Sequence, residues 1–159
     1  RIITIGILLM DNKIVATNRK AYHDYHILDK YETGIELLGS EVKSLREGNA
    51  NLKEGYIVIR KEQAWVLGIH ISPYSHTGFE GHEPVRERRL LLHKREIGKI
   101  KISLEQKGLT AVPLKIYFNS NGWAKLEIGI AKGKKIYDKK KAIRERDIQR
   151  EAERELRNR

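Results

Sequence analysis

Residues 111–131 read AVPLKIYFNSNGWAKLEIGIA, and this stretch decides the fold. Apolar and polar side chains alternate on both sides of residues 119–122, Asn-Ser-Asn-Gly, which are residue types typical of a tight turn. Leu114, Ile116 and Phe118 are therefore expected on one face of the first strand. The pattern predicts a β-hairpin with one buried face.

Two further runs upstream have the composition of strands. Residues 56–60 and 64–71 are short, rich in β-branched and aromatic side chains, and separated by Lys61-Glu62-Gln63. A loop of three residues predicts a second hairpin, and a polar loop is expected to follow at residues 73–84.

Two helices interrupt the strands. The first is predicted from apolar residues at helical spacing: Ile35, Leu38, Val42 and Leu45. Ser40 is its expected N-cap, although residues 31–38 also fit a strand. The second is predicted from Leu90, Ile97, Ile100 and Leu104, and it should end at Gly108. Short strands with two or three flanking helices predict a mainly β fold, and the five-stranded oligonucleotide-binding barrel suits a basic chain.

The positive charge of the chain is uneven. The 159 residues carry 32 Lys and Arg against 21 Asp and Glu, a net charge of +11. Residues 132–159 hold 12 basic and 6 acidic side chains, which is more than half of that excess. We therefore expect a leader at 1–17, a folded body at 18–131 and a basic tail at 132–159. Met10 is the only methionine and a candidate start, with residues 1–9 an artefact upstream of it.

The tail has too few apolar side chains to bury itself. Beyond Tyr137 its large apolar residues are Ile143, Ile148 and Leu156, which cannot offset the entropy of ordering the segment. It is nevertheless prone to helix, with oppositely charged pairs at helical spacing: Asp147–Arg150, Glu151–Arg154 and Glu153–Arg157. The tail is either a solvated terminus or a segment that folds into a helix on a polyanion.

No constellation for catalysis or for a metal is evident. The chain has no cysteine, and its six histidines include a near pair, His76 and His82, that lacks a third ligand. Residues 129–135 resemble a phosphate-binding Walker loop but are one residue short between the glycines. We expect no enzyme, no cofactor and no metal. An alternative hypothesis is an enzyme that processes RNA, and its catalytic cluster would have to be Asp24 with His23 and His26.

The sequence gives little support for a protein that spans or binds a membrane. No apolar run approaches the roughly 20 residues that span a bilayer. A membrane-surface module would need an apolar stripe opposite the charges of the tail, and its three aliphatic residues are too sparse.

Basic, aromatic and amide side chains interleave in residues 18–26, NRKAYHDYH. Such side chains bind phosphates, stack on unpaired bases and read base edges. The same residues also fit an ordinary strand in which every second side chain packs toward the core. Lys43 and Arg46 share one side of the first helix, and a cluster of basic residues surrounds the second: Arg86, Arg88, Arg89, Lys94 and Arg95. These clusters make RNA the leading class of partner.

Several long motifs resemble the small protein B family, the bacterial binding partner of transfer-messenger RNA. They occur in the order of that family, over about residues 16–159: NRKA-x-H-x-Y from Asn18 to Tyr25, EVKSLR from Glu41, LLLHKREI from Leu90, VPLKIY from Val112, and AKGKK-x-YDKK from Ala131 to Lys140. The resemblance implies an oligonucleotide-binding-type barrel with helices around it, no enzymatic activity and a cytoplasmic location.

The resemblance also implies a division of labour. The body would grip the tRNA-like domain of transfer-messenger RNA, supporting its aminoacylation by alanyl-tRNA synthetase and its delivery with elongation factor Tu and GTP to stalled ribosomes. The tail, disordered when free, would become helical in the empty decoding centre and mRNA channel, where no codon is available.

Site residues follow by position in the family motifs. The implied RNA-binding surface comprises Asn18, Arg19, Lys20, His23, Glu32, Leu91 and His93, to which the basic and aromatic pattern adds Tyr25, Lys43 and Arg46. The implied decoding-site motif comprises Lys134, Lys135, Tyr137, Asp138, Lys139 and Lys140. Lys140 stands where the family commonly has arginine, so the planar guanidinium fork is lost there. Glu32 also fits a residue in the first turn of a helix, where the dipole favours a carboxylate.

Overall fold

The computed structural model describes residues 12–74 and 81–158, and within 135–140 it describes the backbone alone. Most of the expected leader and the candidate ligand His76 therefore lie outside the described residues. The helices and strands are β1 (Lys13–Thr17), α2 (Arg19–Asp24), β2 (Tyr25–Ile35), α3 (Gly39–Arg46), β3 (Ala50–Asn51), β4 (Tyr56–Arg60), β5 (Gln63–Leu67), β6 (His70–Ile71), β7 (Arg88–Leu91), α4 (Lys94–Glu105), β8 (Leu109–Phe118), β9 (Ala124–Gly133) and α5 (Lys134–Arg157).

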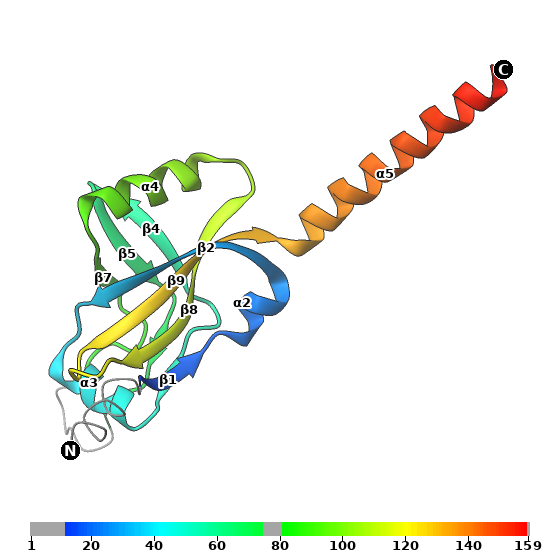
Figure 1. The fold of residues 1–159 in the computed structure, drawn as a ribbon. Coiled ribbons are helices and arrows are strands. Elements are labelled where there is room, and N and C mark those ends of the chain that lie inside the picture. Colours follow the sequence, from blue (N-terminus) through cyan, green and yellow to red (C-terminus); the bar gives the residue numbers. More distant parts are fainter. Residues whose placement is uncertain (1–11, 75–80, 159) are drawn as a thin grey trace, which may run out of the picture.

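Seven strands form one antiparallel sheet in the order β1-β8-β9-β2-β7-β5-β4, and β3 pairs with β6 separately. The sheet curls so far that β4, at one end of it, also lies against β8 (Figure 1). No hydrogen-bonded pair joins β1 to β4 in the described chain, so the sheet is not closed and the predicted oligonucleotide-binding barrel is not confirmed. The expected mainly β architecture with helices around it is confirmed.

The hairpin of β8 and β9 forms where the sequence predicts it. Asn119 closes the turn: its N–H donates to the Trp123 carbonyl at 2.9 Å, and its side-chain oxygen accepts from the Trp123 N–H at 2.9 Å. Ile116 and Phe118 pack in the main core, but Leu114 packs in a second cluster on the other side of the sheet. A bulge between Pro113 and Lys115 causes this, because one extra residue reverses the facing of the side chains before it.

Two strand boundaries differ from the prediction. The run at 64–71 is split into β5 and β6, because Gly68 has φ +76 and turns the chain away from β4. The strand reading of residues 31–38 holds as far as Ile35, where β2 ends.

The starts of the helices also differ from the prediction. Leu38, not Ser40, is the N-cap of α3, and the Glu41 carboxylate accepts from the Leu38 N–H at 2.8 Å. Leu90, expected on the second helix, belongs to β7, and α4 starts only at Lys94. Leu90 is still buried, which explains why its spacing looked helical.

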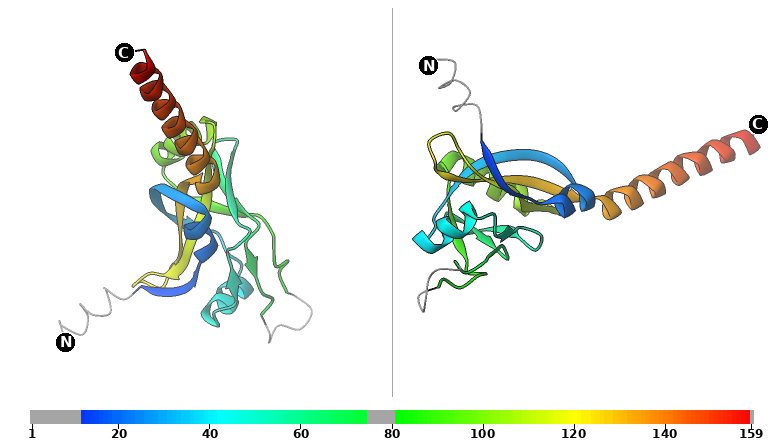
Figure 2. Two further views of the ribbon diagram at one scale, coloured as in Figure 1. Left: turned by 90° about the vertical axis from the view of Figure 1, so that its right-hand side faces the viewer. Right: turned by 90° about the horizontal axis from the view of Figure 1, so that it is seen from below.

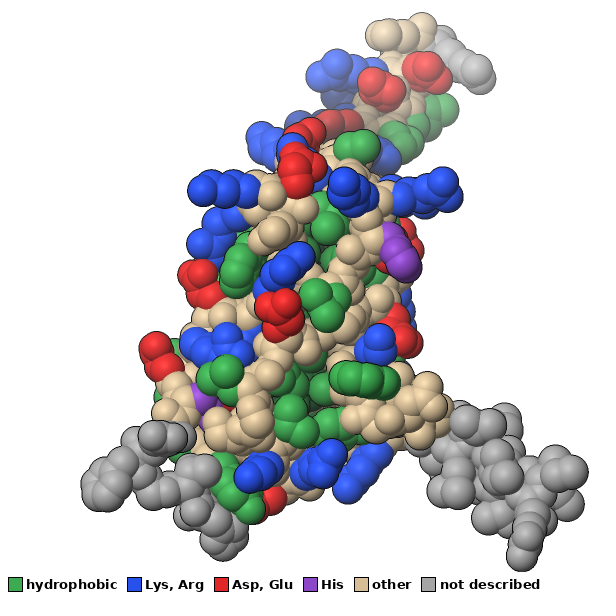
Figure 3. Space-filling model, turned by 90° about the vertical axis from the view of Figure 1, so that its left-hand side faces the viewer, with side chains coloured by type: hydrophobic (Ala, Val, Ile, Leu, Met, Phe, Trp, Pro, Cys, Tyr) green, Lys and Arg blue, Asp and Glu red, His purple; other side chains and the backbone are tan. Residues whose placement is uncertain are grey.

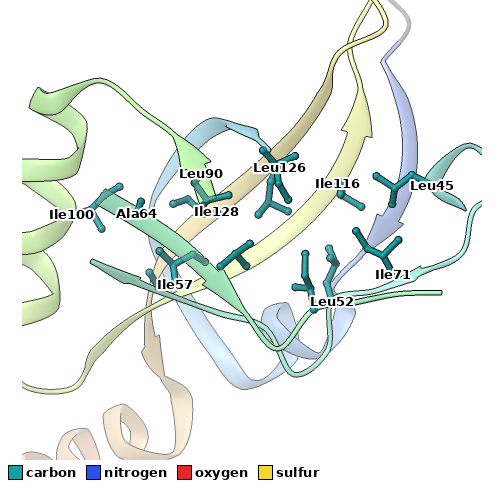
Figure 4. Packing of buried hydrophobic residues seen from close by; sticks show 14 of the residues in the cluster. Leu45, Leu52, Ile57, Ala64, Ile71, Leu90, Ile100, Ile116, Leu126 and Ile128 are labelled. Carbon is teal, nitrogen blue, oxygen red and sulfur yellow. The ribbon is translucent and has the colours of Figure 1, made fainter. Parts of the chain in front are cut away.

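The core lies between the two curled halves of the sheet (Figure 4). Ile116, Leu126 and Ile128 come from the central strands, whereas Ala64 and Ile57 come from the β4–β5 hairpin. Residues from α3 and α4, Leu45 and Ile100, cover its ends. A separate small cluster holds α2 on the outer surface of the sheet through Ala21, Val112, Leu114 and Ala131.

Three charged side chains hold α3 against β7 and the segment just before it. Glu41 and Arg88 are both fully buried, and Arg86 and Arg88 each bind the Glu41 carboxylate. Arg88 also donates to the carbonyl oxygens of Ile69 and Pro84, at 3.3 and 3.1 Å. The expectation that Arg88 belongs to a basic surface cluster is therefore wrong, because the side chain neutralises a carboxylate inside the protein.

Helix α5 projects away from the body as a single rod (Figures 1 and 2). Its large aliphatic residues beyond position 140 are largely exposed, with Leu156 70% accessible. The three oppositely charged pairs predicted along it form no ion pair within 4.0 Å among the described side chains. No helix in the described part of the chain is long and apolar enough to cross a membrane.

Candidate nucleic-acid interface

Residues 19–24 form helix α2 rather than the strand that their alternation allowed. Asn18 causes this: its side-chain oxygen accepts from the Ala21 N–H at 3.1 Å and caps the helix. Its amide nitrogen donates to the carbonyls of Pro113 and Leu52, at 2.8 and 3.2 Å, and the residue is only 4% exposed. Asn18 thus holds the helix against β8, with the polar atoms of its side chain committed to the protein.

The other residues of this motif are accessible. Arg19, Lys20 and His23 are exposed along α2, and Tyr25 is half-buried at the start of β2. The Lys20 ammonium lies 3.5 Å from Glu54, and the His23 Nδ1 lies 2.9 Å from the Asp24 carboxylate. We call this surface, residues 19–25, the α2 face.

A groove of about 830 Å³ lies between β2, β7 and the N-terminal end of α4. Three of the predicted RNA-binding residues line it, namely Glu32, Leu91 and His93. Basic side chains line it too: Lys61, Arg89, Lys94 and Lys125. We call it the α4 groove. The left-hand side of the molecule, seen in Figure 3, shows basic side chains beside exposed hydrophobic ones, a mixture suited to phosphates and bases together.

Glu32 lies on β2, opposite Glu127 of β9, so the reading of it as a first-turn helix residue is wrong. The Tyr117 hydroxyl of β8 donates a hydrogen bond to Glu32, across the intervening strand β9. Burial raises the pKa of Tyr117, and the hydrogen bond to Glu32 raises it further. The hydroxyl therefore stays protonated and keeps the carboxylate in place.

Glu32 and Glu127 carry like charges directly opposite one another and so repel, and two lysines relieve this repulsion. Lys30 and Lys115 lie 3.7 and 3.5 Å from the two oxygens of Glu127. Glu127 is thus paired twice, which leaves Glu32, exposed in the groove, as an acceptor for a ligand.

Lys43 and Arg46 lie in a third place, on the exposed side of α3. The Lys43 ammonium is 5.5 Å from the centre of the Tyr74 ring, and the Arg46 guanidinium is 5.9 Å from that of Phe118. The predicted RNA-binding residues therefore fall into three groups: the α2 face, the α4 groove and α3.

The described part of the decoding-site motif begins at the junction of β9 and α5. The Lys134 ammonium donates to the Tyr22 carbonyl at 3.1 Å and so ties the start of α5 to α2. Lys135, Tyr137, Asp138, Lys139 and Lys140 have helical backbone, and their side chains lie outside the described atoms. Of residues 129–135, which resemble a Walker loop, residues 129–133 belong to strand β9, where the backbone is paired with β2 and β8.

His82 is a structural residue rather than a metal ligand. Its ring is buried, and its Nε2 donates to the Ile71 carbonyl at 2.8 Å while its Nδ1 accepts from the Ser40 hydroxyl at 2.9 Å. No group of three or more His, Asp and Glu side chains placed to hold a metal occurs among residues 12–74 and 81–158.

Two residues that shape this site were not predicted as part of it: Lys125 lines the groove, and Tyr117 binds Glu32 without lining the groove. Lys125 and Tyr117 belong to the hairpin that decides the fold, and the alternation put both on its outer face. Only the strand order brings that face beside Glu32 and Leu91, since β2 and β7 are distant from the hairpin in sequence.

A family model described as SmpB protein matches residues 15–158. The chain belongs to this family. The SsrA-binding protein of Sulfurihydrogenibium sp. is 54% identical over 144 residues, which cover 91% of this chain and 94% of that relative. The SsrA-binding protein of Carboxydothermus hydrogenoformans is 54% identical over 147 residues, 92% of this chain and 98% of that relative.

A solved structure supports the fold of this SmpB family member. It is described as "tmRNA-SmpB: a journey to the center of the bacterial ribosome" and is 45% identical, with a TM-score of 0.66. The match covers 75% of this chain and 83% of that one.

Proposed function

We propose that this protein binds the tRNA-like domain of transfer-messenger RNA and delivers it to stalled ribosomes for trans-translation. The observation that carries the proposal is the match to the SmpB protein family over residues 15–158, together with relatives named SsrA-binding protein. The α4 groove supplies what such binding needs, because it combines basic side chains for phosphates with an exposed carboxylate for base amino groups.

The roles of the three groups differ in this proposal. Glu32, Leu91 and His93 contact the RNA in the α4 groove, and Arg19, Lys20, His23 and Tyr25 extend the contact along the α2 face. Lys43 and Arg46 of α3 supply further phosphate contacts. Asn18 acts as a positioning residue, since its polar side-chain atoms are used to cap and anchor α2.

The tail has the second role. Residues 134–140 occupy the vacant decoding site, and the rest of α5 lies in the mRNA channel, where its arginines and lysines meet ribosomal RNA. In this scheme alanyl-tRNA synthetase and elongation factor Tu with GTP act through the RNA rather than through the protein. We propose a cytoplasmic, non-enzymatic protein without cofactor, whose curled sheet is a variant of the oligonucleotide-binding barrel.

Salt dependence of RNA binding tests the proposal. If the body contacts about five phosphates, a threefold increase in salt should weaken the binding of transfer-messenger RNA by about two decades. The measurement uses the full chain and a form ending at residue 137, which retains β9 whole. Equal affinity at low and high salt in either form would contradict the proposal.

A further inference from the structure

The outer face of the sheet continues the α4 groove across five strands. Directly opposed residues of neighbouring strands share a face, and the pairings connect Ile14 of β1, Tyr117 of β8, Lys125 of β9, Gly34 of β2 and Leu91 of β7. Gly34, Leu91 and Lys125 line the groove itself. The row thus runs from the groove across β9 and β8 to β1, and it crosses β9 at Lys125, close to the β8–β9 turn.

Trp123 lies at the end of this surface. It precedes β9 by one residue, and alternation puts it on the same face as Lys125, because Ala124 and Leu126 pack on the core. Its side chain is 70% exposed, although its backbone is held by two hydrogen bonds to Asn119. An indole that is fixed at its base and open to solvent makes a preformed stacking surface.

The charges around Trp123 favour a nucleic acid. Lys125, two residues away on the same face, makes no ion pair among the described side chains. Side chains two residues apart on a strand are about 7 Å apart, a spacing that neighbouring nucleotides of an unstacked strand span. Lys125 therefore stands between the groove and the indole, where a phosphate would lie.

We infer that Trp123 stacks on an unpaired base of the bound RNA, next to the nucleotide held in the α4 groove, with Lys125 contacting the phosphate between them. This rests on the proposed function and adds a binding residue to it. Every nucleotide of an RNA strand carries both a base for the indole and a phosphate for the lysine, so a single strand matches the two side chains together.

Fluorescence separates this inference from the proposed function. The chain has only two tryptophans, Trp65 and Trp123. In a Trp65→Phe variant the emission reports Trp123 alone, and we expect it to be quenched as transfer-messenger RNA is added. If the RNA binds by an independent measure without quenching, the inference is wrong while the proposed function stands; if no RNA binds, the proposed function itself fails.

Substitutions complete the test. Trp123→Ala should weaken RNA binding by about five- to a hundredfold and leave the salt dependence unchanged, because stacking involves no counterion release. Trp123→Phe should restore most of the affinity. Lys125→Ala should instead reduce the slope of log affinity against log salt by about one. Unchanged affinity in Trp123→Ala would overturn the inference, and so would a loss that Trp123→Phe does not restore.

Discussion

Glu41 is a buried carboxylate that two arginines neutralise inside the protein. Burial by itself raises the pKa of Glu41, but hydrogen bonds from Arg86, the Leu38 N–H and Arg88 outweigh it, so the pKa lies below its usual value. A carboxyl whose pKa is lowered on folding stabilises the protein above its unfolded pKa, near 4.5. The stabilisation is lost as the pH falls below that value and through the folded pKa.

We expect Glu41→Gln to lower the free energy of unfolding at pH 7 by about 3–5 kcal/mol, because Arg88 would stay buried without its counter-charge. Denaturant unfolding measures this loss. The stability of the variant should also depend less on pH below about 4.5 than that of the wild type. A variant as stable as the wild type at pH 7 would show that the pair contributes nothing.

Glu32 is the residue at which binding and stability separate. Glu32→Gln keeps an acceptor for Tyr117 but loses the charge, so we expect RNA affinity to fall about tenfold with the melting temperature nearly unchanged. Tyr117→Phe is the matched control: it keeps the ring and frees the carboxylate, and it should cause a smaller loss of affinity. Calorimetry and RNA titration measure the two quantities. Lost stability with normal affinity would mean that Glu32 has only a structural role.

Among the helices, α4 contains a glycine, Gly98, that neither close packing nor backbone conformation requires. A Cβ at Gly98 would meet nothing within 4 Å, and its φ is not positive. Gly98→Ala should therefore stabilise the protein by about 0.5–1 kcal/mol, because alanine loses less backbone entropy in a helix.

Gly108, just beyond α4, is the control for this prediction. A Cβ there also meets nothing within 4 Å, but φ is +84. Gly108→Ala should destabilise the protein by about 1–2 kcal/mol, the cost of a left-handed alanine. Thermal unfolding of the two variants should therefore shift in opposite directions; shifts of the same sign would show that backbone conformation does not govern them.

For the whole molecule, the question is what the tail adds to the body. Deleting residues 138–159 should leave transfer-messenger RNA binding close to that of the full chain, because the α4 groove and the α2 face belong to the body. The same deletion should abolish tagging of proteins on stalled ribosomes. Tagging at the full rate would make α5 only a solvated terminus, and a collapse of RNA binding would disprove the division between body and tail.

The free state of the tail is a prediction of its own. No described side chain of α5 is fully buried, and among them Lys134 alone hydrogen-bonds to the body, so beyond its first residue the helicity of α5 depends mainly on propensity. We expect residues 138–159 to be largely disordered in the free protein and helical on the ribosome. Far-ultraviolet circular dichroism of the full chain and the deletion form checks this, since equal helical signals are expected from both in free solution.

Local sequence patterns were enough to predict much of the secondary structure, the family and the extent of the tail. The hairpin at residues 111–131 and the β4–β5 hairpin follow from alternation and turn chemistry, and the two amphipathic helices follow from apolar residues at helical spacing. All of these signals act between neighbours in sequence. The motifs at Asn18–Tyr25 and Ala131–Lys140 were sufficient to indicate the SmpB family. The basic tail could be delimited from charge alone.

The tertiary structure decided what depends on contacts between distant segments. Arg88 and Asn18 look like surface residues in sequence, yet they are buried because Glu41, Pro113 and Leu52 offer them partners. A single bulge moved Leu114 to the other face of its strand. The α4 groove exists only because the strand order puts β9 beside β2 and β2 beside β7, and hydrogen-bonding partners of this kind cannot be read from local periodicity.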